Sequence, residues 1–479
     1  NGNGFKGYEL DGGTYTFYIG NTSHCYADSE VAKFTYEVPA GGFKYEKDSV
    51  TDTTITNLFD DVSSGVKEYL SRKNNFENFD VLKGATEKNY RSVTQEFIDT
   101  WGVKSSSNES DPWYSSSMPE QSKTSLSSER TDVKLWQLIG KDYDDELWDK
   151  LLNQLTVSEM VSIISTGNFR TLAIESIDKP LTTDADGPMG FALFMGDSAV
   201  YDTCYYASES VLAATWNRDL ALEMGKMIGE EGLIGNEKGD GRPYSGWYAP
   251  AMNLHRSQFG GRNFEYYSED GLLSGVMASN VVKGARSKGV YTYLKHFALN
   301  EQETKRDDNG LLTWANEQAM RENYFRAFEI AIEEGGAFNV MTSFSRIGTQ
   351  AVANCVPFTK SFLRNECGLP GIVETDCAGD MTDGKHGEAY VSRIVNVYIG
   401  ATDLNEYNYG NDVEDYAGSG VTFANFAPNA EGKGDYGKLG QAMRESAKRI
   451  LYATVNSNAM STMSSGMKIV KITPPWKVA

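Results

Sequence analysis

Residues 290–297 read VYTYLKHF, and this short run decides how the fold is interpreted. Its first half is β-branched and aromatic, a composition that predicts a buried strand. Lys295 and His296 stand near its end, where burying a charged side chain and an imidazole costs free energy unless both have partners or a function. We therefore expect a buried strand whose carboxyl end reaches a polar site.

The same succession of an apolar run and then polar side chains recurs along the chain. The polar residues that follow such runs are Asp186, Asn253, Arg256, Thr342, Ser343, Asp376 and Asp403. Helical stretches such as residues 315–335 lie between the runs. Alternating β and α elements over residues 135–457 predict an α/β fold, a (β/α)8 TIM-type barrel with its active site at the carboxyl ends of the strands.

The chain before the barrel has a different sequence pattern. Residues 1–40 alternate like β-strands but supply only two or three strands, too few for an independently stable sheet. We interpret them as the last part of a β-sandwich whose other strands lie outside this chain. Residues 41–134 are expected to form a connecting segment. It contains two helical patterns and a serine-rich linker, at residues 56–70, 89–102 and 105–129.

The two ends of the barrel carry their own signals. Residues 144–155 have leucines on one side of a helical pattern, which predicts an amphipathic helix. Thr156 and Glu159 form a capping box that opens the next helix. Residues 458–479 are expected to be a C-terminal extension, of which the last stretch, residues 467–479, leaves the barrel.

The bulk composition argues against several classes of partner. The 479 residues carry a net charge of −21, and an acidic surface repels phosphate backbones, so no nucleic acid partner is expected. No stretch approaches the roughly 20 apolar residues of a membrane helix, so no membrane span is expected. The absence of a visible signal peptide favours a cytoplasmic protein. Because the chain starts at Asn1 rather than Met, secretion stays an alternative.

The sequence also argues against a metal or another cofactor. The five cysteines are scattered and lack CxxC spacing, which argues against a disulfide framework and a zinc site, so we expect free or core thiols. The four histidines form no HExxH or comparable pair. Neither a P-loop nor a GxGxxG motif is present, so no nucleotide site is expected.

Three of the polar positions suit chemistry, and each also has a plain structural interpretation. Asp376 ends the strand pattern GIVETD and is either a nucleophile or base, or a helix N-cap. Lys295 is either a Schiff-base nucleophile or, with His296, a donor to the hydroxyls of a bound polyol. The structural alternative for this pair is a lysine paired with a carboxylate beside a satisfied histidine.

Two loop positions complete the candidate site. Arg262 follows a pair of glycines and can aim a rigid fork of donors at a ligand. The carboxylates that follow it, Glu265, Glu269 and Asp270, are either acid/base groups or structural partners of the arginine. Asp186 precedes a Gly-Pro turn and either makes an Asx turn or accepts hydrogen bonds from sugar hydroxyls.

Four motifs together give a specific resemblance. DGPMG (186–190), YAPAMNLHRSQFGGRNFEYYSED (248–270), KHFALNEQETKR (295–306) and FLRNECGLPGIVETD (362–376) occur in the order typical of the barrel domain of glycoside hydrolase family 3. The resemblance implies a retaining, exo-acting β-glycosidase in which Asp376 matches the nucleophile. It also implies that Asp186, Arg262, Lys295 and His296 grip the non-reducing sugar and that Arg306 supports that site.

The departures from the family pattern concern domain order and the acid/base. Residues 1–40 resemble the C-terminal part of a fibronectin type III-like domain, which here precedes the barrel, as in permuted members of the family. The family's acid/base glutamate usually comes from an α/β sandwich, and no matching motif is present. The resemblance therefore implies a sandwich domain upstream or on a companion chain. Cys377 and Phe344 replace the usual Trp and Tyr, which puts aglycone preference in doubt.

Several functions follow as hypotheses. The leading one is a β-glucosidase that acts on a β-glucoside or a short β-linked oligosaccharide through a covalent glycosyl-enzyme on Asp376. A β-xylosidase and a non-catalytic sugar-binding member are the alternatives within the family. An aldolase that uses Lys295 is a further alternative. A homo-oligomer is compatible with each of them.

Overall fold

The structure of the chain is a computed structural model. It describes residues 5–59 except 23, 72, 131–192 except 166 and 168, and 203–235. It further describes residues 241–306 except 305, 311–376 except 312 and 349, 402–405 and 436–460. Among these residues, no helix is long and apolar enough to cross a membrane. The expected helix at 89–102, the serine-rich linker at 105–129 and Cys377 lie outside the described residues.

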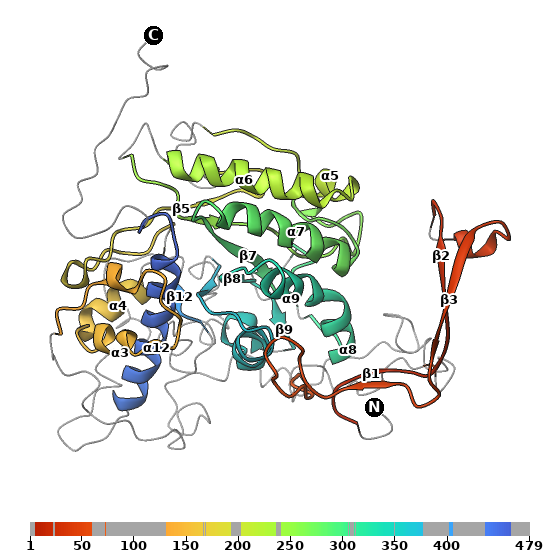
Figure 1. Ribbon diagram of the computed structural model, residues 1–479, viewed down its shortest axis with the longest axis horizontal. Helices are drawn as coiled ribbons and strands as arrows, with labels where there is room; N and C mark the ends of the chain where they lie inside the picture. The colour runs from red at the N-terminus through yellow and green to blue at the C-terminus, as the bar shows by residue number, and fades with distance from the viewer. Residues whose placement is uncertain are drawn as a thin grey trace, which may run out of the picture.

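A parallel sheet of six described strands forms the centre of the molecule. Its strands are β5 (Asp184–Asp186), β6 (Gly246–Tyr248), β7 (Tyr291–Phe297), β8 (Asn339–Thr342), β11 (Val373–Thr375) and β12 (Leu404–Asn405). Neighbours in the sheet follow sequence order, and every pair is parallel. A sheet wound in one direction with helices outside it is a TIM-like α/β arrangement. The expected α/β barrel is therefore supported at this level (Figure 1).

The strand predicted from residues 290–297 is confirmed as β7, whose seven residues are all buried. Its carboxyl end carries Lys295 and His296, and the parallel pairing sets the ends of its neighbours at the same edge of the sheet. Asp186 is the last residue of β5, and Asp376 directly follows β11. These side chains therefore gather at one edge of the sheet.

Helices cover the outside of the sheet. They are α5 (Glu209–Ala214), α6 (Arg218–Ile234), α7 (Gly271–Arg286), α8 (Glu317–Ala319), the π-helical turns η9 (Met320–Tyr324) and η11 (Pro357–Glu366), and α9 (Arg326–Glu333). The Asn217 and Asp270 side chains cap the amino ends of α6 and α7. A Cβ on Gly225 would lie 2.1 Å from the Val281 carbonyl oxygen, so α6 and α7 approach as closely as they do because this position is glycine.

A second group of helices packs beside the carboxyl-terminal strands of the sheet. It comprises η5 (Leu135–Leu138), α3 (Leu147–Leu152), α4 (Val157–Ser165) and α12 (Tyr436–Val455), which share one apolar core (Figure 1). The expected amphipathic helix at 144–155 is α3, with Leu151 and Leu152 buried. The capping box is confirmed, because Thr156 and Glu159 exchange side-chain and backbone hydrogen bonds of 2.8–3.2 Å.

The amino-terminal region forms two antiparallel strand pairs. β1 (Tyr8–Leu10) pairs with β4 (Phe43–Tyr45), and β2 (Gly13–Ile19) pairs with β3 (Ala32–Val38). The β2–β3 ribbon projects away from the central sheet (Figure 1). Because β4 lies beyond residue 40, the β-region extends past the boundary expected there. Residues 56–59 are not helical, unlike the pattern predicted for 56–70, whose remainder lies outside the described residues.

The remaining described elements are short. They are η1 (Cys25–Ala27), η6 (Glu175–Ile177), η8 (Asn263–Glu265), β9 (Arg346–Ile347), β10 (Gln350–Ala351) and η10 (Val352–Asn354). The four described cysteines are free thiols, as expected. Asn458, the first residue of the expected C-terminal extension, packs on the barrel: its side chain accepts the Ser245 hydroxyl at 2.7 Å and donates to the Tyr244 carbonyl at 2.9 Å. The stretch expected to leave the barrel, residues 467–479, lies outside the described residues.

Candidate active site

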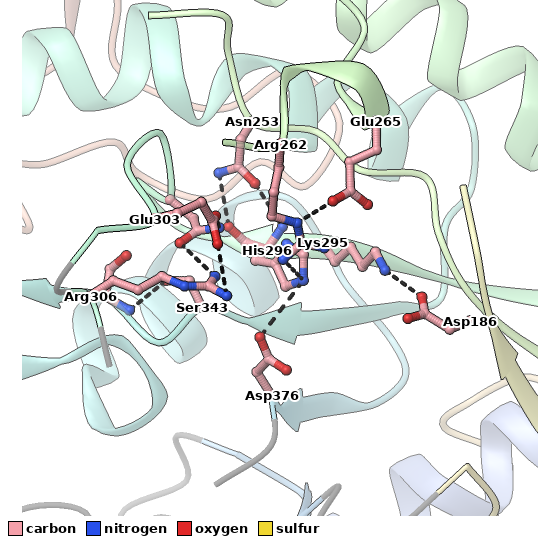
Figure 2. A network of polar contacts seen from close by, with 12 residues as sticks. Asp186, Asn253, Arg262, Glu265, Lys295, His296, Glu303, Arg306, Ser343 and Asp376 are labelled. Atoms are coloured by element: carbon pink, nitrogen blue, oxygen red, sulfur yellow. Dashed lines mark hydrogen bonds and ion pairs between the residues drawn. The ribbon is translucent and has the colours of Figure 1, made fainter. Parts of the chain in front are cut away.

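A lysine–aspartate pair joins two strands at the carboxyl edge of the sheet (Figure 2). Nζ of Lys295, at the end of β7, lies 2.5 Å from Oδ1 of Asp186, at the end of β5. The same oxygen accepts the N–H of the next residue, Gly187, at 2.8 Å. The residue two positions on is Pro188, which has no N–H, so Asp186 makes no Asx turn. The lysine side chain is 3% exposed and the aspartate 20%, so the pair reaches the surface only on its acidic side.

His296 and Arg262 form a second contact beside this pair. Nη1 of Arg262 lies 3.2 Å from Nε2 of His296, and Nε of Arg262 donates to the Glu265 carboxylate. A guanidinium only donates, so Nε2 accepts and the proton of the neutral ring sits on Nδ1. Burial lowers the pKa of His296 well below its usual value, and three neighbouring cations, first Arg262, lower it further. His296 is therefore neutral at physiological pH.

Asp376 faces this histidine from the end of β11 (Figure 2). Its Oδ2 lies 3.7 Å from Nε2 of His296, which is too long for a hydrogen bond. Its side chain is 11% exposed, so the carboxylate is shielded without being sealed off. Asp376 thus lies at the mouth of the site, next to a neutral imidazole.

An asparagine fixes the backbone of this strand end. Asn253 donates from Nδ2 to the His296 carbonyl at 3.0 Å and accepts the His296 N–H on Oδ1 at 2.9 Å. Glu301 accepts the Leu254 N–H at 3.2 Å, and burial raises the pKa of this carboxyl to about 7. Asn253 stood out in the sequence only as a polar residue after a strand, and Glu301 gave no signal there.

Arg306 occupies the edge of the same group. Its guanidinium donates to Asn300 Oδ1 at 3.0 Å and lies 3.0 Å from Oε2 of Glu303. The guanidinium carbon is 4.7 Å from the centre of the Phe344 ring. Arg306 therefore stands beside the site with its own acidic partner, and the sequence did not single out Glu303.

The structure brings together five of the six predicted site residues around one point, with Arg306 at the border. These are Asp186, Arg262, Lys295, His296 and Asp376 (Figure 2). Two of the carboxylates that follow Arg262 have structural partners. Glu265 pairs with the arginine, and Asp270 caps α7 through the Leu273 N–H at 2.7 Å.

Two of the polar residues expected at strand ends lie elsewhere. Asp403 precedes β12 instead of following a strand, and it accepts the Val373 N–H at 2.9 Å at the amino end of β11. Its carboxylate also pairs with Arg364 and, at 2.9 Å, with Arg449, so its place is in a buried ion-pair network. Arg256 is exposed and donates to the Tyr324 hydroxyl.

The described residues offer no metal site at this edge of the sheet. One group of three carboxylates among them could share a cation, Asp48, Glu329 and Glu333, and it contains no residue of the site. The site itself combines acceptors on Asp186, donors on Lys295 and Arg262, and the carboxylate of Asp376. Such alternation of donors and acceptors suits a ligand with several hydroxyl groups.

Comparison with known proteins gives a consistent family match. Residues 177–393 match the model of the glycosyl hydrolase family 3 N-terminal domain. Two curated relatives are "Beta-glucosidase B" of Emericella nidulans, 38% identical over 236 residues, and "Beta-glucosidase A" of Butyrivibrio fibrisolvens, 33% identical over 247 residues. The matches cover 48% and 52% of this chain but only 26% and 28% of the relatives. The chain thus matches about a quarter of the length of these relatives.

Solved structures agree. Beta-glucosidase 3B from Thermotoga neapolitana, in complex with α-D-glucose, has a TM-score of 0.53 at 29% identity, with 66% of this chain and 43% of that chain covered. A beta-glucosidase from Paenibacillus barengoltzii has a TM-score of 0.62 at 21% identity and covers 97% of this chain and 46% of its own. At 21% identity, the similarity to the Paenibacillus barengoltzii structure supports the fold alone.

Proposed function

We propose, from the premise that this chain belongs to glycoside hydrolase family 3, that it is the barrel part of a retaining, exo-acting β-glucosidase. The reaction removes terminal β-D-glucosyl residues from a β-glucoside or a short β-linked oligosaccharide. One observation carries the proposal: the Asp376 carboxylate, partly open at the carboxyl end of β11, faces donors and acceptors that suit a sugar ring. The two curated relatives, both named beta-glucosidases, support the same substrate class.

In the proposed reaction Asp376 is the nucleophile. Its carboxylate attacks the anomeric carbon as the bond to the leaving oxygen breaks, which yields a glucosyl ester and an alcohol once that oxygen is protonated. The acid/base group that protonates the leaving oxygen then activates a water molecule, which hydrolyses the ester and restores the carboxylate. The two inversions at the anomeric carbon give overall retention.

The charge balance of the site favours this chemistry. Lys295 is neutralised by Asp186 and Arg262 by Glu265, while His296 is neutral. The remaining charge is that of Asp376, so the site is negative where the sugar ring becomes positive. Fixed charges that complement the transition state in a shielded site give a large part of enzymatic rate acceleration.

The proposed grip on glucose uses the same side chains. Asp186 accepts hydrogen bonds from ring hydroxyls, and Lys295, Arg262 and His296 donate to them. Nδ1 of His296 is buried and has no hydrogen-bond partner among the described residues, so its N–H is a donor that a hydroxyl would satisfy. Arg306 supports this group from its border through Asn300 and Glu303.

The ion pair of Lys295 argues against the aldolase alternative. A Schiff-base nucleophile needs a neutral amine. Nζ of Lys295 is instead held 2.5 Å from the Asp186 carboxylate, so a carbonyl substrate would have to displace this buried contact. Lys295 therefore fits the grip on a ligand better than covalent chemistry.

The proposal includes the number of barrel strands and the identity of the neighbouring domains. The six strands are part of an eight-stranded (β/α)8 barrel, and the amino-terminal strand pairs are the end of a fibronectin type III-like domain. Supporting this, the β2–β3 ribbon carries Phe17 stacked on Phe34 at 4.8 Å, with both rings about half exposed, as expected of a sandwich face without its partner sheet. The acid/base comes from an α/β sandwich domain outside this chain, and the protein is cytoplasmic.

Substrates with activated leaving groups test whether this chain supplies the nucleophile but not the acid/base. A dinitrophenyl β-glucoside needs no protonation of its leaving group, whereas an alkyl β-glucoside does. The chain alone is expected to release dinitrophenol and to leave the alkyl glucoside nearly intact, and Asp376→Asn is expected to abolish the release. Nitrophenyl xyloside, assayed beside the glucoside, separates the β-xylosidase alternative. Glucose binding without any dinitrophenol release would instead support a non-catalytic sugar-binding protein.

A further inference from the structure

Residues 51–59, here called the anchor segment, connect the amino-terminal strand pairs to the outside of the barrel. Thr51 Oγ1 donates to the Glu366 carbonyl at 2.8 Å, and Thr53 Oγ1 donates to the Asn365 carbonyl at 2.7 Å. The chain that follows β4 accordingly lies against the helices near α8 (Figure 1). The anchor segment is therefore part of the packed structure of the barrel.

A buried carboxylate and a guanidinium hold the end of the anchor segment. Glu317 accepts the backbone N–H groups of Leu58 and Phe59 at 2.9 and 3.3 Å. Arg321 pairs with Glu317 at 2.8 Å and donates to the Thr56 carbonyl at 3.0 Å. Both charged side chains are about 95% buried, which makes these charge-assisted bonds costly to lose.

Phe59 is fully buried in a cluster of phenylalanine rings. Its ring centre lies 4.8 Å from that of Phe358, 5.4 Å from Phe325 and 6.3 Å from Phe362. The same three rings surround Phe297 of β7, at 6.1, 4.8 and 6.2 Å respectively. Phe59 and Phe297 therefore rest on the same neighbours.

Phe297 directly follows His296, and its carbonyl accepts the Ser343 N–H at 2.7 Å. A dense aromatic core transmits displacement because it has few voids. We propose that Phe59 is a positioning residue: by packing against the rings that hold Phe297, it fixes the end of β7 and with it His296 and Lys295. The anchor segment thus couples the amino-terminal strand pairs to the site. Its effect on sugar turnover rests on the proposed function, whereas its effect on His296 does not.

Histidine NMR on the full chain tests the positioning directly. The chain has four histidines, so ¹H–¹³C spectra contain four ring Cε1–H signals, and the one that is missing in His296→Gln belongs to His296. In Phe59→Ala the His296 signal is expected to move by more than any of the other three. Phe59→Leu, which keeps most of the volume, is expected to fold and to move it less in the same direction. Ile55→Ala is the matched control, because Ile55 is buried in the same segment outside the aromatic cluster.

The kinetics of glucoside cleavage by the same variants provide the second test. Phe59→Ala is expected to lower kcat/KM for dinitrophenyl β-glucoside by about 10- to 100-fold, as small misplacements of a site do. Phe59→Leu is expected to restore most of it, and Ile55→Ala to leave it unchanged. An unmoved His296 signal in folded Phe59→Ala, or in Phe59→Leu if the alanine variant does not fold, would overturn the positioning role. A moved signal in a chain that cleaves no glucoside would leave positioning intact and count against the proposed function alone.

Discussion

The backbone N–H and the backbone carbonyl of His296 are both bonded to a single side chain, that of Asn253. Oδ1 of Asn253 accepts the His296 N–H at 2.9 Å, and Nδ2 donates to the His296 carbonyl at 3.0 Å. Both residues are buried. This pair of bonds ties the end of β7 to the segment after β6, which leads to Arg262.

Asn253→Ala is predicted to cost about 1–3 kcal/mol of unfolding free energy, because it leaves a buried N–H and carbonyl without partners. KM for an activated glucoside is expected to rise more than kcat falls, since the ring of His296 loses its support. Chemical denaturation and steady-state kinetics measure the two effects. Asn280→Ala, which removes a half-buried amide bonded within α7, is the control and should leave the kinetics unchanged.

The Lys295–Asp186 pair is predicted to be strongly coupled. Lys295→Met leaves a carboxylate without its cation, and breaking a buried pair costs about 3–5 kcal/mol, less here because Asp186 is partly exposed. The double variant with Asp186→Asn is expected to recover part of the lost unfolding free energy while glucose binding stays weak. Additive effects on stability in this double-mutant cycle would show that the contact contributes little.

The neutral state of His296 predicts a pH dependence of stability. Its pKa is lowered by folding, so below about pH 6.5, the unfolded value, the unfolded chain binds a proton that the folded site refuses. This component of stability is therefore present above that pH and is lost as the pH falls towards the lowered pKa. Denaturation at several pH values should show a shallower acid loss in His296→Gln than in the unaltered protein; equal slopes would mean that His296 takes up its proton in the folded state.

Asp403 is predicted to act on stability and not on chemistry. Burial alone would raise its pKa, but Arg364 and Arg449 outweigh this and lower it, so its carboxylate stabilises the fold above its unfolded pKa and loses this role as the pH falls. Asp403→Asn leaves two buried guanidinium groups short of an anion and is expected to cost about 3–5 kcal/mol. Below its melting temperature this variant should keep its kcat, in contrast to Asp376→Asn. A large loss of kcat in the folded variant would place Asp403 in the reaction.

The sequence predicted β7 and the convergence of Lys295, Asp186 and Asp376 for a clear physical reason. A buried parallel strand has an apolar, β-branched and aromatic composition, and parallel strands end at a common edge. Asp403 was misplaced because it follows the apolar run at residues 398–401 but precedes β12, and composition alone does not indicate on which side of Asp403 the strand lies.

Contacts between distant segments were out of reach of the sequence. Glu317 bonds to the backbone of Leu58 and Phe59 across about 260 residues of chain, and no local pattern marks such a partner. Residues 56–59 open the stretch 56–70 that the sequence predicts as helical, yet tertiary bonds to Glu317 and Arg321 hold them in a non-helical path. Because the sequence predicts a helix that contains Phe59, it does not predict the packing of this residue in the aromatic cluster.

Covalent trapping on Asp376 tests the central claim most directly. A 2-fluoroglucosyl fluoride carries a leaving group that needs little acid assistance, so the first step still proceeds. Its 2-fluorine destabilises the positively charged transition states, which makes hydrolysis of the ester slow, so the 2-fluoroglucosyl ester accumulates. Incubation of the chain followed by peptide mass analysis is predicted to find one 2-fluoroglucosyl group on Asp376 and none in Asp376→Asn. Labelling at another residue, or labelling that persists in Asp376→Asn, would contradict the assignment of this carboxylate as the nucleophile.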